Sequence, residues 1–132
     1  MRSTLLAPAL LLAAGCALAK DRPADAVVQA KLDKALAGLT PGTPTSCIPI
    51  TLPTLNSRTY GRTILYSRGR NEVYRNDTAG GCEAAGNGDI LVSVEHEGRP
   101  CSGDIVRTVD PYTHITSGSC ALGQFVPYRR AR

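Results

Sequence analysis

The chain has 132 residues, of which 15 are basic and 11 acidic, giving a formal net charge of +4; 42% of the residues are hydrophobic and 20% are charged. This length holds one ordinary domain at most, which excludes a multidomain enzyme and a large α/β barrel. The balance of apolar and charged residues is typical of a globular protein and excludes a fibrous or wholly disordered chain.

The first 19 residues have the pattern of an export signal. Arg2 provides a positive start, and 5–14 is an uncharged run of ten residues rich in Leu and Ala. A helix that spans a bilayer needs about 20 apolar residues, so this run is too short. We therefore interpret 1–19 as a bacterial-type signal peptide. No later run is long enough to form a transmembrane helix.

Two processing sites compete in this segment. Residues 17–19, Ala-Leu-Ala before Lys20, fit a small-x-small cleavage site. Residues 13–16, Ala-Ala-Gly-Cys, resemble a bacterial lipobox, although Ala13 stands where Leu is usual. In that case Cys16 would be lipidated and would become the mature N-terminus. Both alternatives predict an exported protein, either soluble in the periplasm or anchored to the membrane by lipid at Cys16.

Without Cys16, four cysteines remain in the chain. An even number in a small exported chain predicts two disulfides. Four cysteines allow three pairings, which the sequence alone does not distinguish. We expect Cys101–Cys120 and Cys47–Cys82, because each pair would join segments that are expected to be neighbouring strands.

A helix followed by a linker is predicted for 20–46. Pro23 suits a first helical turn, Gly38 suits the left-handed residue that ends a helix, and turn-forming residues follow at 41–45. These signals place the helix at about 23–37 and a turn-rich linker after it. Apolar residues recur at helical spacing and form the face expected to pack on the rest of the molecule: Val28, Leu32, Leu36 and Leu39.

From Cys47 to the C-terminus the pattern becomes β. Runs of β-branched and aromatic residues alternate with turns, and 62–66 and 72–75 flank a Gly-containing turn that indicates a hairpin. The spacing predicts a mainly β fold, a small antiparallel sandwich or half-open barrel, preceded by one amphipathic helix and stabilised by two disulfides over 47–132. Other strands are expected at 48–52, 90–94, 104–110 and, broken at Gly123, 119–128, with a loop at 76–88.

The sequence has no recognised catalytic motif. It lacks a nucleophile elbow, a zinc-protease motif, a phosphate-binding loop and a calcium loop. Asp104 suits a turn, the acid–base-capable group 95–97 is expected in a hairpin loop, and His114 near Asp110 is expected in a surface loop. We therefore predict no catalytic residue and no cofactor.

Metal binding is not expected either. No two cysteines form a C-x-x-C pair, and His96 and His114 do not lie at a ligand spacing. Sulfurs paired in disulfides also provide no nucleophilic thiolate.

Arginines gather around the first hairpin and at the C-terminus. This candidate basic surface consists of Arg58, Arg62, Arg68, Arg70, Arg75, Arg129 and Arg130. Such a surface fits an anionic lipid, the cell wall or an acidic protein, although arginine at outward strand positions is ordinary. A nucleic-acid partner is not expected, because the chain is only mildly basic and has no recognised motif.

Short motifs along nearly all of the mature chain carry a resemblance. In the first half they are Ala35-Leu36-Ala37-Gly38, Pro41-Gly42, Ser46-Cys47-Ile48 and Arg62-Thr63-Ile64-Leu65-Tyr66. In the second half they are Asn76, Gly81-Cys82, Asp89-Ile90-Leu91-Val92, Cys101-Ser102-Gly103-Asp104-Ile105, Ser117-Gly118-Ser119-Cys120 and Phe125-Val126-Pro127-Tyr128. With them the chain resembles small exported proteins of unknown function from sphingomonad-type proteobacteria. The resemblance implies no activity and no catalytic residue.

Three functions of different classes remain. The first is a non-enzymatic binding or structural module of the bacterial envelope, whose partner is an unidentified envelope component. The second is a small inhibitor of a cell-wall hydrolase, by analogy of fold and compartment. The third is an enzyme with an unrecognised site, which would have to bring Asp104 together with His96 or His114.

Overall fold

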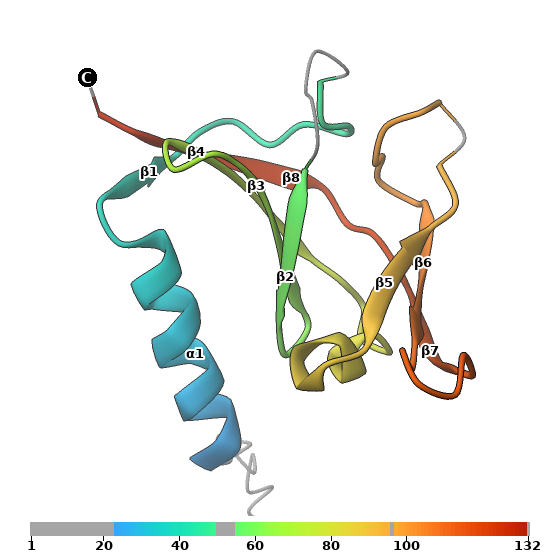
Figure 1. Cartoon of the computed structure of the whole chain (residues 1–132). Coiled ribbons are helices and arrows are strands. Elements are labelled where there is room, and N and C mark those ends of the chain that lie inside the picture. Colours follow the sequence, from blue (N-terminus) through green and yellow to red (C-terminus); the bar gives the residue numbers. More distant parts are fainter. Residues whose placement is uncertain (1–22, 50–54, 96, 132) are drawn as a thin grey trace, which may run out of the picture.

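The computed structural model describes residues 23–49, 55–95 and 97–131, and this part of the chain forms one α-helix, eight strands and a short 3-10 helix (Figure 1). The helix is α1 (Pro23–Leu36) and the 3-10 helix is η1 (Glu83–Asn87). The strands are β1 (Leu39–Pro41), β2 (Asn56–Tyr60), β3 (Thr63–Arg68), β4 (Glu72–Asp77), β5 (Ile90–Ser93), β6 (Ile105–Val109), β7 (Thr116–Ala121) and β8 (Phe125–Arg130). The predicted fold class is confirmed: the chain is mainly β, with one preceding helix and two disulfides.

The strands form two antiparallel sheets. The first has the order β1-β8-β4-β3-β2, and the second has the order β5-β6-β7. The predicted hairpin is β3–β4, in which Leu65 lies opposite Arg75. The expected strands at 90–94 and 104–110 correspond to β5 and β6, and the run 119–128 is divided between β7 and β8 around Gly123.

Two strands were not predicted because their sequences are short and polar. The start of the expected linker forms β1, which pairs with the end of β8, and Thr45 forms an isolated bridge with Phe125. The polar run Asn-Ser-Arg-Thr-Tyr forms β2, because the tight turn at Gly61 places it against β3. Of the expected strand at 48–52, residues 50–52 lie outside the described residues.

The main core lies between the two sheets. Phe125 is fully buried there, and its ring contacts that of Tyr66 edge-on at a centroid distance of 5.7 Å. The other face of the five-stranded sheet is covered by α1, whose Leu32 packs with Leu65 and Val73. The predicted apolar face of the helix is thus the face that packs. The remaining members of the main core are Ile48, Ile64, Tyr74, Cys82, Val106, Cys120 and Leu122.

The disulfides join Cys47 to Cys101 and Cys82 to Cys120, so the expected pairing was wrong. The pairing of β6 with β7 places Cys120 opposite Val106, several residues beyond Cys101. The backbone of Cys101 instead forms an isolated antiparallel β-bridge with that of Cys47, which brings their side chains together. Cys120 lies in the main core and is joined there to Cys82, which immediately precedes η1.

Two disulfides fit an oxidising environment outside the cytoplasm. Among the described residues, no helix is long and apolar enough to cross a membrane. Cys16, both candidate processing sites and His96 lie outside the described residues.

Candidate functional site

The two sheets leave a seam between β2 and β5 (Figure 1). Each of these strands is the last one of its sheet, and η1 lies between them at one end. The seam contains an open cavity of about 400 Å³, which we call the β2–β5 seam. It is lined by Ser57, Arg58, Thr59, Ala85, Gly86, Asp89, Ile90 and Leu91.

The hydrogen-bond pattern shows which backbone groups of β2 face this seam. The carbonyl of Arg62 accepts the N–H of Thr78 on the β4 side. Because backbone groups alternate in an antiparallel ladder, the odd-numbered residues of β3 bond to β2, and Ser57 and Thr59 direct their N–H and C=O groups away from β3. A Cβ added at Gly86 would lie 3.4 Å from the Thr59 carbonyl oxygen, which agrees with this direction.

The same reasoning applies to β5. The N–H of Val94 donates to a carbonyl at the start of β6 over 3.4 Å, whereas the N–H of Asp89 donates to Ala84 in η1 over 3.3 Å. Backbone groups at 90 and 92 therefore face β6, and those of Leu91 and Ser93 face the seam. Within the described residues, no backbone hydrogen bond occupies the outward groups of Ser57, Leu91 or Ser93. As far as the described residues go, the seam is therefore bordered by two free strand edges.

Basic side chains lie beside the seam, on the α1 side of the sheet. Arg58 is opposite Leu65, which packs under α1, so the two side chains are on the same face. There, Arg58 shares an open hollow of about 570 Å³ with Lys31 and Lys34 of α1, and another of about 510 Å³ also reaches Arg58. No ion pair within the described part of the chain involves these three residues. We call Lys31, Lys34 and Arg58 the Arg58 cluster.

A buried hydroxyl also borders the seam. Thr59 is only 8% exposed, and its Oγ1 has no hydrogen-bond partner among the described residues. The buried Tyr66 hydroxyl also has no hydrogen-bond partner among the described residues. Its pKa is raised mainly by burial and further by the charges of Glu95 and Asp104. A buried hydroxyl without a partner costs about 1–3 kcal/mol, so a ligand that bonds to Thr59 would recover part of this energy.

The predicted arginine surface is divided in the structure. Four of its members pair with carboxylates: Arg62 with Glu83, Arg68 and Arg129 with Glu72, and Arg75 with Asp77. Arg70 lies in the β3–β4 turn and Arg130 at the end of β8. Arg58 instead lies beside two lysines of α1, Lys31 and Lys34. Their spacing of three residues puts Lys31 and Lys34 on one flank of α1, but only the packing of α1 brings them to Arg58.

The Glu72 carboxylate is the centre of a second charged group. Arg129 contacts it at 2.8 Å, Arg68 at 3.9 Å, and the Tyr74 hydroxyl donates to it over 3.0 Å. Burial alone would raise the pKa of Glu72, but the hydrogen bonds from Arg129 and Tyr74, with the charges of Arg129 and Arg68, lower it below its usual value. Both arginines contact this one carboxylate, and such a hydrogen-bonded group is typical of a structural role.

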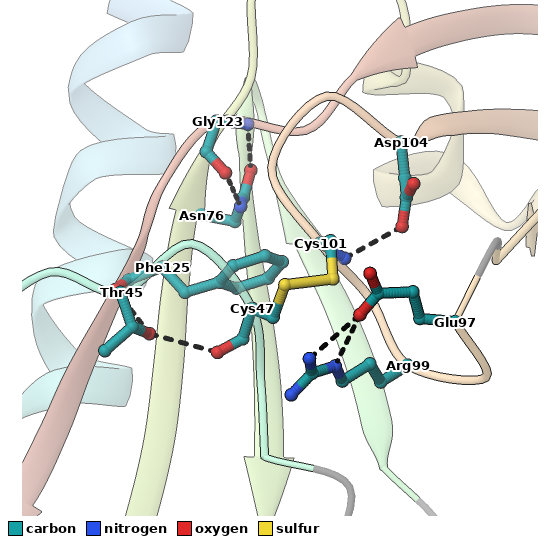
Figure 2. The surroundings of a disulfide bond; sticks show 9 residues. All are labelled: Thr45, Cys47, Asn76, Glu97, Arg99, Cys101, Asp104, Gly123 and Phe125. Atoms are coloured by element: carbon teal, nitrogen blue, oxygen red, sulfur yellow. Dashed lines mark hydrogen bonds and ion pairs between the residues drawn. A yellow bond between two sulfur atoms is a disulfide. The ribbon is translucent and has the colours of Figure 1, made fainter.

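Figure 2 shows the half-buried disulfide Cys47–Cys101 and the acidic residues beside it. Glu97 has a carboxylate oxygen within 4.8 Å of both sulfurs, and Arg99 contacts that carboxylate at 2.8 Å. The sulfurs are bonded to each other, so they provide no thiolate for a metal. Asp104 accepts the N–H of Cys101 over 2.8 Å, which agrees with its expected place in a turn.

Of the two alternatives in the enzyme hypothesis, Asp104 with His114 is not brought together, and His96 lies outside the described residues. Asp104 immediately precedes β6, whereas His114 follows its far end in an exposed loop. A strand of this length separates them by more than about 10 Å. The carboxylate of Asp110 accepts the backbone N–H groups of Tyr112 and Thr113, and within the described structure it forms no hydrogen bond or ion pair with the His114 side chain.

Comparisons with protein-family models, curated proteins and solved structures give no match. The resemblance to small exported proteins of sphingomonad-type proteobacteria therefore stays a prediction.

Proposed function

We propose that the protein is an exported, non-enzymatic binding module that holds an anionic ligand at the Arg58 cluster. The observation that carries this proposal is the convergence of three hollows on Arg58, beside two lysines of α1. Positive side chains without an ion-pair partner create a local potential that attracts anions. By contrast, four other arginines of this chain already form ion pairs with carboxylates.

Location in the bacterial envelope is part of the same proposal. It is supported by the signal-like segment 1–19 and by the two disulfides. With lipid at Cys16, the diacylglyceryl group would provide two chains, which suffice for stable anchoring. Wild-type protein should then sediment with membranes, and Cys16→Ser should release it. Soluble wild-type protein that begins at Lys20 would contradict the anchor and favour ordinary secretion.

The anion site is tested by binding of the mature protein to poly-L-glutamate at several salt concentrations. Wild-type protein should bind, and its affinity should fall as salt rises, because screening weakens charge attraction. Arg58→Ala should weaken binding at least fivefold, and the double substitution Lys31→Ala and Lys34→Ala should have a similar effect. Arg70→Ala is the matched control, since it removes an exposed arginine outside the cluster. Equal binding by Arg58→Ala and wild type would overturn the proposal.

The inhibitor hypothesis is favoured by a different feature, the β6–β7 loop at 110–115. Tyr112 is 90% exposed and Ile115 is 66% exposed. Asp110 organises the loop: its carboxylate accepts N–H groups from Tyr112 at 2.8 Å and Thr113 at 2.7 Å, and its N–H donates to the Ile115 carbonyl at 3.0 Å. A preorganised loop with an exposed tyrosine is suited to entering an enzyme cleft, because little entropy is lost on binding.

A panel of lysozyme-type hydrolases tests this second candidate. Inhibition by the wild-type protein should be lost in Tyr112→Ala and retained in Val94→Ala, which removes a different exposed apolar side chain. Acid should also weaken inhibition. The backbone hydrogen bonds from Thr113 and Tyr112 lower the pKa of Asp110. The ionised carboxylate therefore holds the loop at neutral pH, and the loop loosens as pH falls through the lowered pKa. Absence of inhibition across the panel would contradict the hypothesis.

A further inference from the structure

We propose that the anionic ligand is an extended acidic peptide that adds to β2 as a new strand in the β2–β5 seam. This inference rests on the proposed function of the Arg58 cluster and names the chemical class of its ligand. It uses features that charge alone does not explain, namely the free strand edges and the buried hydroxyl of Thr59.

The free edge of β2 provides the backbone contacts. Ser57 is exposed, and its N–H and C=O groups point away from β3 into the seam. An added strand forms a pair of hydrogen bonds with such a residue, which is the common way in which peptides bind to sheet edges. At Thr59 the edge is approached by Gly86 of η1, so this end of the seam limits how far the new strand extends. Across the seam, Leu91 and Ser93 present a second free edge.

The two faces of the seam determine the side chains that such a peptide needs. Side chains of neighbouring strands lie next to one another on each face of a sheet. Every second peptide side chain would therefore lie beside Arg58, where carboxylates are favoured by Lys31 and Lys34 as well. The side chains between them would point toward the interior, beside Thr59 and Leu91, where small or β-branched residues fit. The expected ligand thus alternates acidic and β-branched residues.

Charge favours an acidic peptide over a second copy of this chain. Pairing of β2 with β2 of another molecule would bring two Arg58 clusters together, each with three positive side chains that make no ion pair among the described residues. Like charges on adjacent strands are destabilising. An acidic strand in the same position replaces this repulsion by attraction and keeps all of the backbone hydrogen bonds.

The experiment compares two blocked seven-residue peptides of alternating Val and Glu, which differ only in N-methylation of alternate backbone nitrogens. Both carry the same charge, but the methylated peptide cannot donate the hydrogen bonds of a new strand. Calorimetry with the mature, disulfide-bonded protein should show that the unmethylated peptide binds at least tenfold more tightly. Equal affinity would overturn strand addition and leave the Arg58 anion site intact. Absence of binding by the unmethylated peptide would also overturn it.

Substitutions in the protein provide an independent test. Ser57→Pro removes only an outward N–H, a change that edge strands tolerate, whereas Ser57→Ala retains it. Ser57→Pro should weaken binding of the unmethylated peptide at least tenfold, whereas Ser57→Ala should behave as wild type. Equal binding by Ser57→Pro and Ser57→Ala would overturn the inference. A wild-type dimer that Ser57→Pro dissociates, measured by light scattering, would assign the edge to a second copy and overturn it too.

Discussion

One side of the sandwich is closed by the chain itself, whereas the opposite side is open at the β2–β5 seam. On the closed side, residues 122–124 lead directly from β7 of one sheet into β8 of the other. Asn76 and Thr45 bond to this crossing segment and to the start of β8. On the open side, β2 and β5 end their sheets, and no strand of the described part of the chain pairs with their outer edges. If the closed side provides stability and the open side provides binding, substitutions on the two sides should separate these two properties.

The largest loss of stability is expected for Phe125→Ala on the closed side. Phe125 is 0% exposed and packs edge-on against Tyr66 in the main core. Truncation of a fully buried phenylalanine leaves a cavity and costs about 3–5 kcal/mol. Urea unfolding should show this loss, while Ile90→Ala, at a half-exposed position in the seam, should change stability by less than about 1 kcal/mol. Similar losses in both variants would contradict the division between the two sides.

The second largest effect is expected for Asn76→Ala. The fully buried Asn76 amide donates to the Gly123 carbonyl over 2.7 Å and accepts the Gly123 N–H over 2.9 Å, as Figure 2 shows. Alanine would leave both backbone groups without this partner, at a cost of about 2–4 kcal/mol. Asn71→Ala, in an exposed turn, is the control and should unfold at the wild-type urea concentration. A wild-type midpoint for Asn76→Ala would mean that the crossing segment does not depend on this clamp.

The sequence was sufficient to predict the parts of the fold that have strong local patterns. The β3–β4 hairpin has alternating apolar residues around a glycine turn, and α1 has apolar residues at helical spacing, so both were predicted. The strand β2 is polar, and it exists because β3 lies beside it. The pairing Cys47–Cys101 depends on a contact between segments 54 residues apart, which no local pattern specifies.

The candidate site was less accessible from the sequence than the fold. Arg58 was included in a surface of seven arginines, but nothing in the sequence indicates which of them pair with carboxylates. Lys31 and Lys34 belong to α1, and they reach Arg58 only because the apolar face of α1 packs on β3 and β4. The free edges of the seam follow from the order of strands in two sheets, which is a property of the tertiary fold.

A smaller effect on stability is expected for Glu72→Gln. Glu72 lies between Arg68 and Arg129, and loss of its charge should cost about 1 kcal/mol because the pairs are partly exposed. The folded protein lowers the pKa of Glu72, so this contribution is present above the pKa of the unfolded chain and is lost as pH falls through the folded value. The urea midpoints of wild type and Glu72→Gln should therefore differ at pH 7 and converge in the acid range. A constant difference across this range would show that charge is not the cause.

The smallest effect on stability, and the largest on binding, is expected for Arg58→Ala. Its side chain is exposed and makes no ion pair within the described residues, so its removal should change the free energy of unfolding by about 0.5 kcal/mol or less. The repulsion that it exerts on Lys31 and Lys34 is also removed, so the sign of this change is expected to be neutral or stabilising. Urea unfolding and poly-L-glutamate binding should be measured on the same preparation. A loss of stability above about 1 kcal/mol would place Arg58 among the structural residues and remove the distinction between the open side and the closed side.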